Sequence, residues 1–212
     1  MFKIFHAMTL VAVVFISGCS EPSQNGPSAK SEQVESRYEE GKHYRIVNNI
    51  NVGALKTPFL VEYFWLGCPH CQNFEKPLQD FKSVNPEVGF IRKHAVLSES
   101  WVNDGRIFYA LQETKNMAHF AELFDLYKSG INDEDFDAFF TKNNIDKHSF
   151  LAVAGNNENV INNMKESYKE MSENEMTSVP SIVVNGKYLI IASEDTNNNE
   201  KYFKLVNYLL KK

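Results

Sequence analysis

Two cysteines, Cys68 and Cys71, stand where an apolar run ends and a helical pattern begins. The run Phe59–Trp65 is apolar except for Glu62, and the turn-forming residues on both sides indicate a buried central β-strand. Gly67 ends this run. From Cys68 onward the apolar residues recur at intervals of four and three, as in a helix: Phe74, Leu78 and Phe81. A buried strand that leads directly into a helix is typical of α/β folds, so we predict one here.

A cysteine at the start of a helix is suited to redox chemistry. The free backbone N–H groups and the dipole of the helix stabilise a thiolate at Cys68. Pro69 suits the first turn because a proline there loses no helical hydrogen bond, and His70 adds a possible donor to the thiolate. Cys71 lies one turn further in, where we expect it to be more buried. We therefore predict a redox-active disulfide in which Cys68 exchanges with substrates and Cys71 resolves the mixed disulfide. Because a stabilised thiolate makes the disulfide more oxidising, donation of disulfides is favoured over reduction.

Glu62 is a carboxyl group in the middle of the predicted buried strand. Burying an ionised carboxylate is costly unless it is paired or hydrated, or becomes neutral. Glu62 precedes Cys68 by only six residues, so we expect it to lie beneath the active-site helix with a raised pKa. From there it would relay protons to or from Cys71. The alternative is that the strand lies at the edge of the sheet and that Glu62 is solvated.

The rest of the chain places a helical block between two sets of strands. Short β patterns occur at Tyr44–Val47 and at Val88–His94, and we expect the second to be buried. Residues 99–174 show apolar residues at helical spacing, with Asp133 as a candidate helix cap. Two β-rich runs then flank Asn185-Gly186, a strong hairpin signal, and an amphipathic helix follows. This order predicts one sheet interrupted by a helical insertion.

The first 37 residues differ from the rest. Lys3 and the short apolar run Ala7–Ile16 resemble a signal peptide, and the sequence Ile-Ser-Gly-Cys that ends at Cys19 resembles the lipobox of bacterial lipoproteins. We therefore predict a lipoprotein signal peptide at residues 1–18 and a lipid on Cys19. Residues 19–37 are polar and predict a flexible tether. The protein is thus expected in the periplasm, anchored to the inner or the outer membrane. The alternative is an ordinary secretory signal with a chance cysteine.

Charge and ligand spacing exclude two other classes of function. The formal net charge is −5 and no cluster of basic residues occurs, which argues against nucleic acid as a partner. A structural zinc site needs four ligands. Beside Cys68, His70 and Cys71, the remaining histidines of the predicted domain (43, 94, 119 and 148) show no paired spacing. We therefore expect no metal, and these histidines are expected at the surface or in the core.

Several segments resemble the DsbA family of periplasmic disulfide oxidases. In chain order they are Tyr38–Tyr44, Val61–Phe64, Gly67–Cys71, Val179-Pro180 and Val184–Tyr188. The resemblance implies a thioredoxin-like fold with an inserted helical domain. Its parts would be residues 38–98 and 175–212 for the thioredoxin-like domain and 99–174 for the insertion. It also implies that Val179-Pro180 is a cis peptide that faces the two cysteines, and that the Val179 backbone binds an extended substrate.

The same resemblance carries expectations about the charged residues and the partners. Glu62 matches the buried acid of the family and Glu75 a second acid, while either Arg92 or Lys93 matches a basic residue close by. The substrates would be unfolded or newly exported proteins with free thiols. A membrane oxidase of the DsbB type, linked to quinone, would regenerate the disulfide. No cofactor is implied, and we expect a monomer.

Two other functions remain compatible with this fold. A reductase or isomerase would use the same cysteines, but it needs a supply of electrons, and isomerases usually carry a dimerisation module for which the tether is too short. A chaperone-like binding module would keep the fold without turnover, and the intact Cys68, Cys71 and Val179-Pro180 argue against it.

Overall fold

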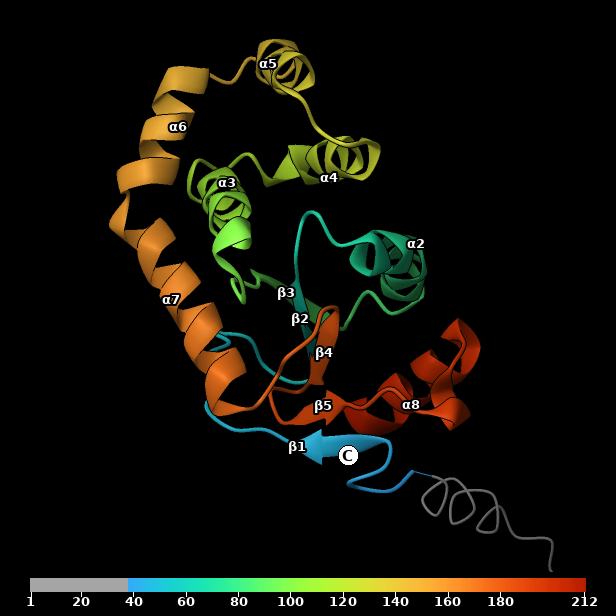
Figure 1. Ribbon diagram of the computed structural model, residues 1–212. Coiled ribbons are helices and arrows are strands. Elements are labelled where there is room, and N and C mark those ends of the chain that lie inside the picture. The colour runs from blue at the N-terminus through green and yellow to red at the C-terminus, as the bar shows by residue number, and fades with distance from the viewer. Residues whose placement is uncertain (1–37) are drawn as a thin grey trace, which may run out of the picture. The chain divides into compact units, whose positions relative to one another are not determined.

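The computed structural model describes residues 38–212 (Figure 1). The predicted signal peptide, the predicted tether and Cys19 lie outside these residues. Residues 38–212 contain the elements in the order expected from the sequence, namely two strands, a helix, a strand, a helical block, a hairpin and a final helix. No helix in this part of the chain is both long enough and apolar enough to cross a membrane.

The strands of the described region form one mixed sheet in the order β1-β5-β4-β2-β3. Their bounds are β1 (Tyr44–Ile46), β2 (Phe59–Phe64), β3 (Gly89–His94), β4 (Ser181–Val184) and β5 (Tyr188–Ile190). Strand β2 runs parallel to β3, and the other three neighbouring pairs in this sheet are antiparallel. Strand β2 has a partner on each edge, and all of its residues are buried, which confirms the predicted buried strand.

The Asn-Gly hairpin predicted from the sequence joins β4 to β5. Asn185 has a φ of 53° and Gly186 a φ of 66°, the left-handed backbone that these two residue types tolerate best. Asn185 also fastens the hairpin to the start of β2. Its N–H donates to the Phe59 carbonyl at 2.9 Å, and its Oδ1 accepts from the Phe59 N–H at 3.1 Å. The turn therefore holds β4 in register beside the strand that leads to the cysteines.

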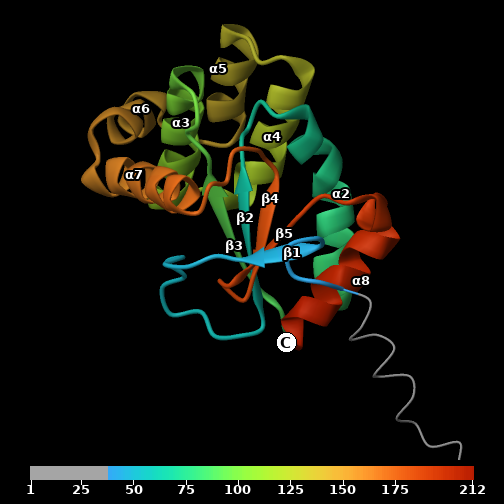
Figure 2. The same ribbon diagram turned by 60° about the horizontal axis from the view of Figure 1, so that its bottom comes forward.

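Helices cover both faces of the sheet (Figure 2). In the described residues they are α2 (Pro69–Val84), α3 (Val102–Glu113), α4 (Phe120–Ser129), α5 (Asp133–Lys142), α6 (Lys147–Asn156), α7 (Glu158–Glu173) and α8 (Asn199–Leu210). Helices α2 and α8 pack on one face, where Leu78 and Leu205 belong to the same apolar cluster as Leu60 of β2. The end of α7 packs on the other face, where Met171 belongs to the same apolar cluster as Tyr63.

Helices α3 to α7 form the insertion between β3 and β4. Their core is aromatic: Phe64 at the end of β2 contacts Phe108, Phe120 and Phe124 edge to face, with ring centroids 5.0, 5.7 and 5.7 Å apart. The same apolar cluster includes Cys68 and Cys71. The insertion therefore packs directly against the end of the sheet that carries the cysteines.

Two expectations about local structure were wrong. Strand β3 is not fully buried, because β2 is its only partner and the first half of β3 is partly exposed at the sheet edge. Asp133 does not cap α5 but is its first residue. The cap is Asn132, whose extended backbone lets its Oδ1 accept from the Asp135 N–H at 2.9 Å.

Candidate active site

Cys68 caps the start of α2. Its backbone is extended, and its Sγ accepts the N–H of Cys71 at 3.3 Å. Pro69 follows as the first helical residue, a position where a backbone N–H would have no partner within the helix, so its absence costs no helical hydrogen bond. The two thiols are free in this structure. A helix N-terminus that donates to Sγ is the arrangement that stabilises a thiolate there.

The two cysteines differ in their surroundings. Cys71 is 1% exposed and Cys68 is 5% exposed. Burial raises the pKa of the Cys71 thiol well above its ordinary value, and the hydrogen bond with Cys68 adds to the rise. Cys71 therefore keeps its proton unless a nearby base removes it. Pro69 and His70, which lie between the cysteines, are both exposed and face the solvent.

Val179, which precedes Pro180, lies against Cys68 although the two residues are 111 positions apart in the chain. The Val179–Pro180 peptide bond is cis, as predicted. The Cys68 thiol donates to the Val179 carbonyl, with 3.7 Å between Sγ and O. Both residues are partly exposed beside the thiol. The structure therefore brings together Cys68, Cys71 and the Val179-Pro180 segment at one end of the sheet.

A buried charge cluster lies on the α2 face of the sheet. Glu62 is 1% exposed, and its Oε2 accepts from Arg92 Nε at 2.6 Å. A second nitrogen of Arg92, Nη2, donates to Glu75 at 2.6 Å. Burial raises the pKa of Glu62, and the positive charge of Arg92 opposes this rise. The alternative of an exposed edge position for Glu62 is thereby excluded, and the basic partner is Arg92.

The charge of Glu62 also acts on Cys71. The Glu62 carboxylate raises the pKa of the Cys71 thiol, although less than burial, the hydrogen bond with Cys68 and the charge of Cys68 do. Glu75 is the more exposed acid of the cluster and lines a cavity of about 640 Å³ together with Gln72 and Arg92. Protons from the solvent can thus reach Glu75, which shares Arg92 with Glu62.

Sequence reasoning did not identify the residues that hold the loop before Cys68. The N–H of Leu66 donates to His94 Nε2 at 3.2 Å, and the Leu66 carbonyl accepts from Gln72 Nε2 at 2.8 Å. Burial lowers the pKa of His94 to about 3, so its ring stays neutral and its Nε2 stays an acceptor. The sequence indicated only that His94 is a core or surface histidine. Nothing in a single sequence links it to Leu66.

Trp65 packs on the other side of this loop. Its ring stacks on Trp101, with centroids 4.5 Å apart, and its Nε1–H donates to Asp104 at 2.6 Å. The Trp65 carbonyl accepts the N–H of Cys68 at 3.1 Å. Gly67 lies directly against the Trp65 ring, where a β-carbon would come within 2.5 Å of it. Glycine is therefore required at this position by close packing.

The variant Gly67→Ala is expected to displace the Trp65 ring and to lower the free energy of unfolding by about 1–3 kcal/mol. The ring cannot move aside freely because Trp101 and Asp104 hold it. Urea unfolding followed by tryptophan fluorescence measures both effects. Gly155→Ala is the matched control, since a β-carbon there meets nothing within 4 Å. Equal unfolding midpoints for the two variants would contradict the expected clash.

Comparisons with known proteins agree on one family. A sequence model of the family described as thioredoxin matches residues 45–207. The thiol:disulfide interchange protein DsbA of Pseudomonas aeruginosa is 29% identical over 183 residues, which cover 82% of this chain and 85% of that protein. The protein of the same name from Azotobacter vinelandii is 33% identical over 135 residues, 61% of this chain and 63% of the relative. The crystal structure of Pseudomonas aeruginosa DsbA superposes with a TM-score of 0.68 at 27% identity, covering 83% of this chain and 94% of that one.

Proposed function

Because this chain belongs to the thioredoxin family and is a thiol–disulfide oxidoreductase of the DsbA type, we propose that it works as an oxidase. It would donate the Cys68–Cys71 disulfide to thiols of exported proteins in the bacterial cell envelope. The observation that carries this direction is the Cys68 Sγ at the start of α2, which accepts the Cys71 N–H at 3.3 Å. An environment that stabilises the Cys68 thiolate stabilises the reduced protein, and a stable reduced form makes the disulfide a strong oxidant.

The reaction proceeds in two exchanges. A substrate thiolate attacks Cys68 in the disulfide, a new sulfur–sulfur bond forms, and Cys71 leaves with the electron pair. A second substrate thiolate then attacks the substrate sulfur of this mixed disulfide, and Cys68 leaves as a thiolate. The substrate loses two electrons and gains a disulfide, while the protein gains two electrons and ends as a dithiol.

Glu62 supplies the proton that Cys71 needs in the first exchange. The leaving Cys71 thiolate is buried, and its raised pKa favours rapid protonation. The pKa of Glu62 is also raised by burial, so this carboxyl group holds a proton more readily than an exposed glutamate does. In reoxidation the same carboxylate would accept the proton from Cys71. Exchange with solvent would run through Glu75 and the cavity beside it.

The substrate chain would bind beside Cys68 along Val179-Pro180. Both residues are partly exposed, and the Val179 carbonyl already faces the Cys68 thiol. An extended peptide can pair with a free backbone edge and present its cysteine to Cys68. Pro69 and His70 follow Cys68 directly, are exposed and would contact the same substrate.

The N-terminal sequence and the similarity to DsbA proteins support a location in the cell envelope. We place the protein in the periplasm, held by a lipid on Cys19 and a tether at residues 19–37, with residues 1–18 removed as a signal peptide. It would act as a monomer. Its disulfide would be renewed by a membrane oxidase of the DsbB type, because an oxidase that gives away its disulfide needs an electron acceptor in turn.

The equilibrium redox potential of the Cys68–Cys71 pair tests the proposed direction. We expect a value of about −120 mV against glutathione, which is the potential known for DsbA, whereas thioredoxin lies at about −270 mV. Mass spectrometry of alkylated protein in a series of glutathione buffers measures it. A potential near that of thioredoxin would indicate a reductase and overturn the oxidase proposal.

A further inference from the structure

Two neighbouring residues of β3, Arg92 and Lys93, each form a buried ion pair, and the two pairs lie on opposite faces of the sheet. Glu62 stands opposite Arg92 and Tyr63 stands opposite Lys93 in the parallel register. Since side chains alternate along a strand, Arg92 points to the α2 face and Lys93 to the α7 face. There Lys93 Nζ lies 2.7 Å from both carboxylate oxygens of Glu170. The pair Lys93–Glu170 has no part in the thiol chemistry described above.

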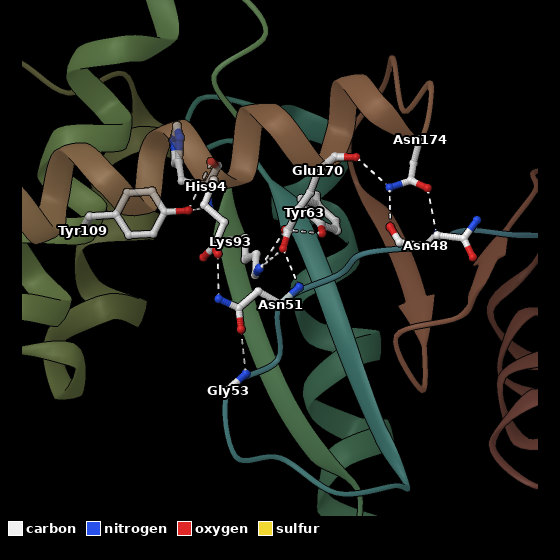
Figure 3. Close-up of polar contacts among 10 residues, drawn as sticks. Asn48, Asn51, Gly53, Tyr63, Lys93, His94, Tyr109, Glu170 and Asn174 are labelled. Carbon is white, nitrogen blue, oxygen red and sulfur yellow. Dashed lines mark hydrogen bonds and ion pairs between the residues drawn. The ribbon is translucent and has the colours of Figure 1, made fainter.

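Glu170 is also bonded to two other segments (Figure 3). Its Oε2 accepts from the Tyr63 hydroxyl at 2.6 Å, and its Oε1 accepts from the Asn51 N–H at 2.6 Å. The carboxylate is thus held by β3, by β2 and by the loop that precedes β2. A buried charge that is fully bonded in this way has little freedom to shift. Glu170 therefore fixes the last turn of α7 on the sheet.

Asn174 makes a second attachment directly after α7. Its Nδ2 donates to the Asn48 carbonyl at 2.9 Å, and its Oδ1 accepts from the Asn48 N–H at 2.9 Å (Figure 3). The Arg45 guanidinium donates to the Asn174 carbonyl. These bonds fix the backbone at the point where the chain leaves α7 for the active site.

The segment between α7 and β4 carries Val179 and Pro180. The elements on either side of this segment are both bonded to Tyr63. The Tyr63 hydroxyl holds Glu170 at one end, and the Tyr63 backbone pairs with Ser181 at the other. Val179 follows Glu170 by only nine positions, so a shift of α7 on the sheet is passed to the Val179 carbonyl beside Cys68. Together with Asn174, the Lys93–Glu170 pair thereby fixes the position where this segment begins.

We propose that Lys93 and Glu170 are positioning residues for substrate docking. They fix the last turn of α7 on the sheet, and this turn keeps the Val179 backbone beside Cys68. This inference rests on the proposed function, in which the substrate chain binds along Val179-Pro180. It does not involve the cysteines directly. Loss of the pair should therefore weaken peptide binding without altering the exchange chemistry.

The test replaces both charges with apolar side chains of similar length, Lys93→Met with Glu170→Met. Such double replacements of buried pairs usually preserve folding, and they leave the net charge unchanged. We expect the KM for oxidation of a cysteine-containing peptide to rise about tenfold, within the range for residues that act on a site through others. The kcat should stay within about twofold. The rate with dithiothreitol, which needs no docking surface, should also stay within about twofold, and the redox potential should be unchanged.

The matched control is Lys169→Met with Glu173→Met, an exposed pair on the same helix α7. It removes the same charges and should leave the KM unchanged. Tyr63→Phe is a milder variant that removes only the hydroxyl bonded to Glu170, and it should raise the KM about two- to threefold. This variant keeps the proposal testable if the double variant fails to fold.

Two results would overturn the proposal. The first is an unchanged KM in the folded double variant or, if that variant does not fold, in Tyr63→Phe. The second is a dithiothreitol rate that falls as much as the peptide rate, which would indicate a purely structural role. Failure of the oxidase proposal is seen separately, as a reducing potential of the wild-type protein. In that case the KM for reduction of a disulfide peptide tests the positioning role in the reverse direction.

Discussion

The variant Cys71→Ala is expected to remain covalently joined to its substrate through Cys68. In the wild-type protein the Cys68 thiolate attacks a peptide–glutathione disulfide, glutathione leaves, and Cys71 then attacks Cys68 and releases the peptide. Cys71 lies one turn from Cys68, and well-oriented intramolecular reactions have effective molarities of about 10⁵ M or more. Its removal should slow the release of the peptide by at least about a thousandfold.

Intact-mass spectrometry after mixing with a single-cysteine peptide–glutathione disulfide measures the adduct. The control is Cys68→Ala, which should form no adduct and show no turnover, because the remaining Cys71 is 1% exposed and burial raises its pKa. An adduct on Cys71 in this control, or release from Cys71→Ala at the wild-type rate, would reverse the roles assigned to the two cysteines.

The variant Arg92→Met is expected to lower the free energy of unfolding at neutral pH by about 3–5 kcal/mol, the usual cost of leaving one charge of a buried pair alone. Arg92 joins Glu62 and Glu75, and its removal leaves the Glu62 carboxylate buried without its ion-pair partner. Urea unfolding measures the loss. Glu75→Gln is the control, since Glu75 is 20% exposed and its loss keeps Arg92 paired with Glu62, so we expect a loss of about 1 kcal/mol.

The loss in Arg92→Met should depend on pH. Burial raises the pKa of Glu62 above its ordinary value of 4.5, while Arg92 opposes the rise. The folded protein therefore binds this proton more readily than the unfolded chain, so the Glu62 contribution to stability decreases as the pH rises from 4.5 through the folded-state pKa. Without Arg92 the pKa rises further. The difference from wild type should be largest at neutral pH and should shrink on acidification, and a difference independent of pH would contradict this assignment.

The parts of the fold that the sequence predicted are those set by local patterns. The apolar run before Cys68, the helix after it and the Asn185-Gly186 turn each have a signal within about ten residues, and each is present in the structure. The cis bond before Pro180 was predicted from the family resemblance and is also present. The edge position of β3 was missed because the number of partners of a strand depends on the whole sheet.

The contacts of the charged residues could not be predicted from the sequence alone. Two basic residues in succession on a strand must point to opposite faces, but only the pairing of β3 with β2 decides that Arg92 meets Glu62. Glu170 follows Lys93 by 77 positions and reaches it because the helical insertion returns to the sheet. Contacts of this kind arise from tertiary packing, for which the local spacing of residues gives no signal.

The position of the helical insertion also affects when the active site is complete during synthesis of the chain. Cys68 and Val179 are 111 positions apart, yet they meet at one thiol. A chain that is synthesised from its N-terminus contains Cys68 and Cys71 long before β4, which completes the sheet beside β2. An unfinished chain therefore holds the complete cysteine motif without the segment that faces it. Translation must pass the insertion, and β4 must join the sheet, before the thiol pair and the Val179 carbonyl form a single site.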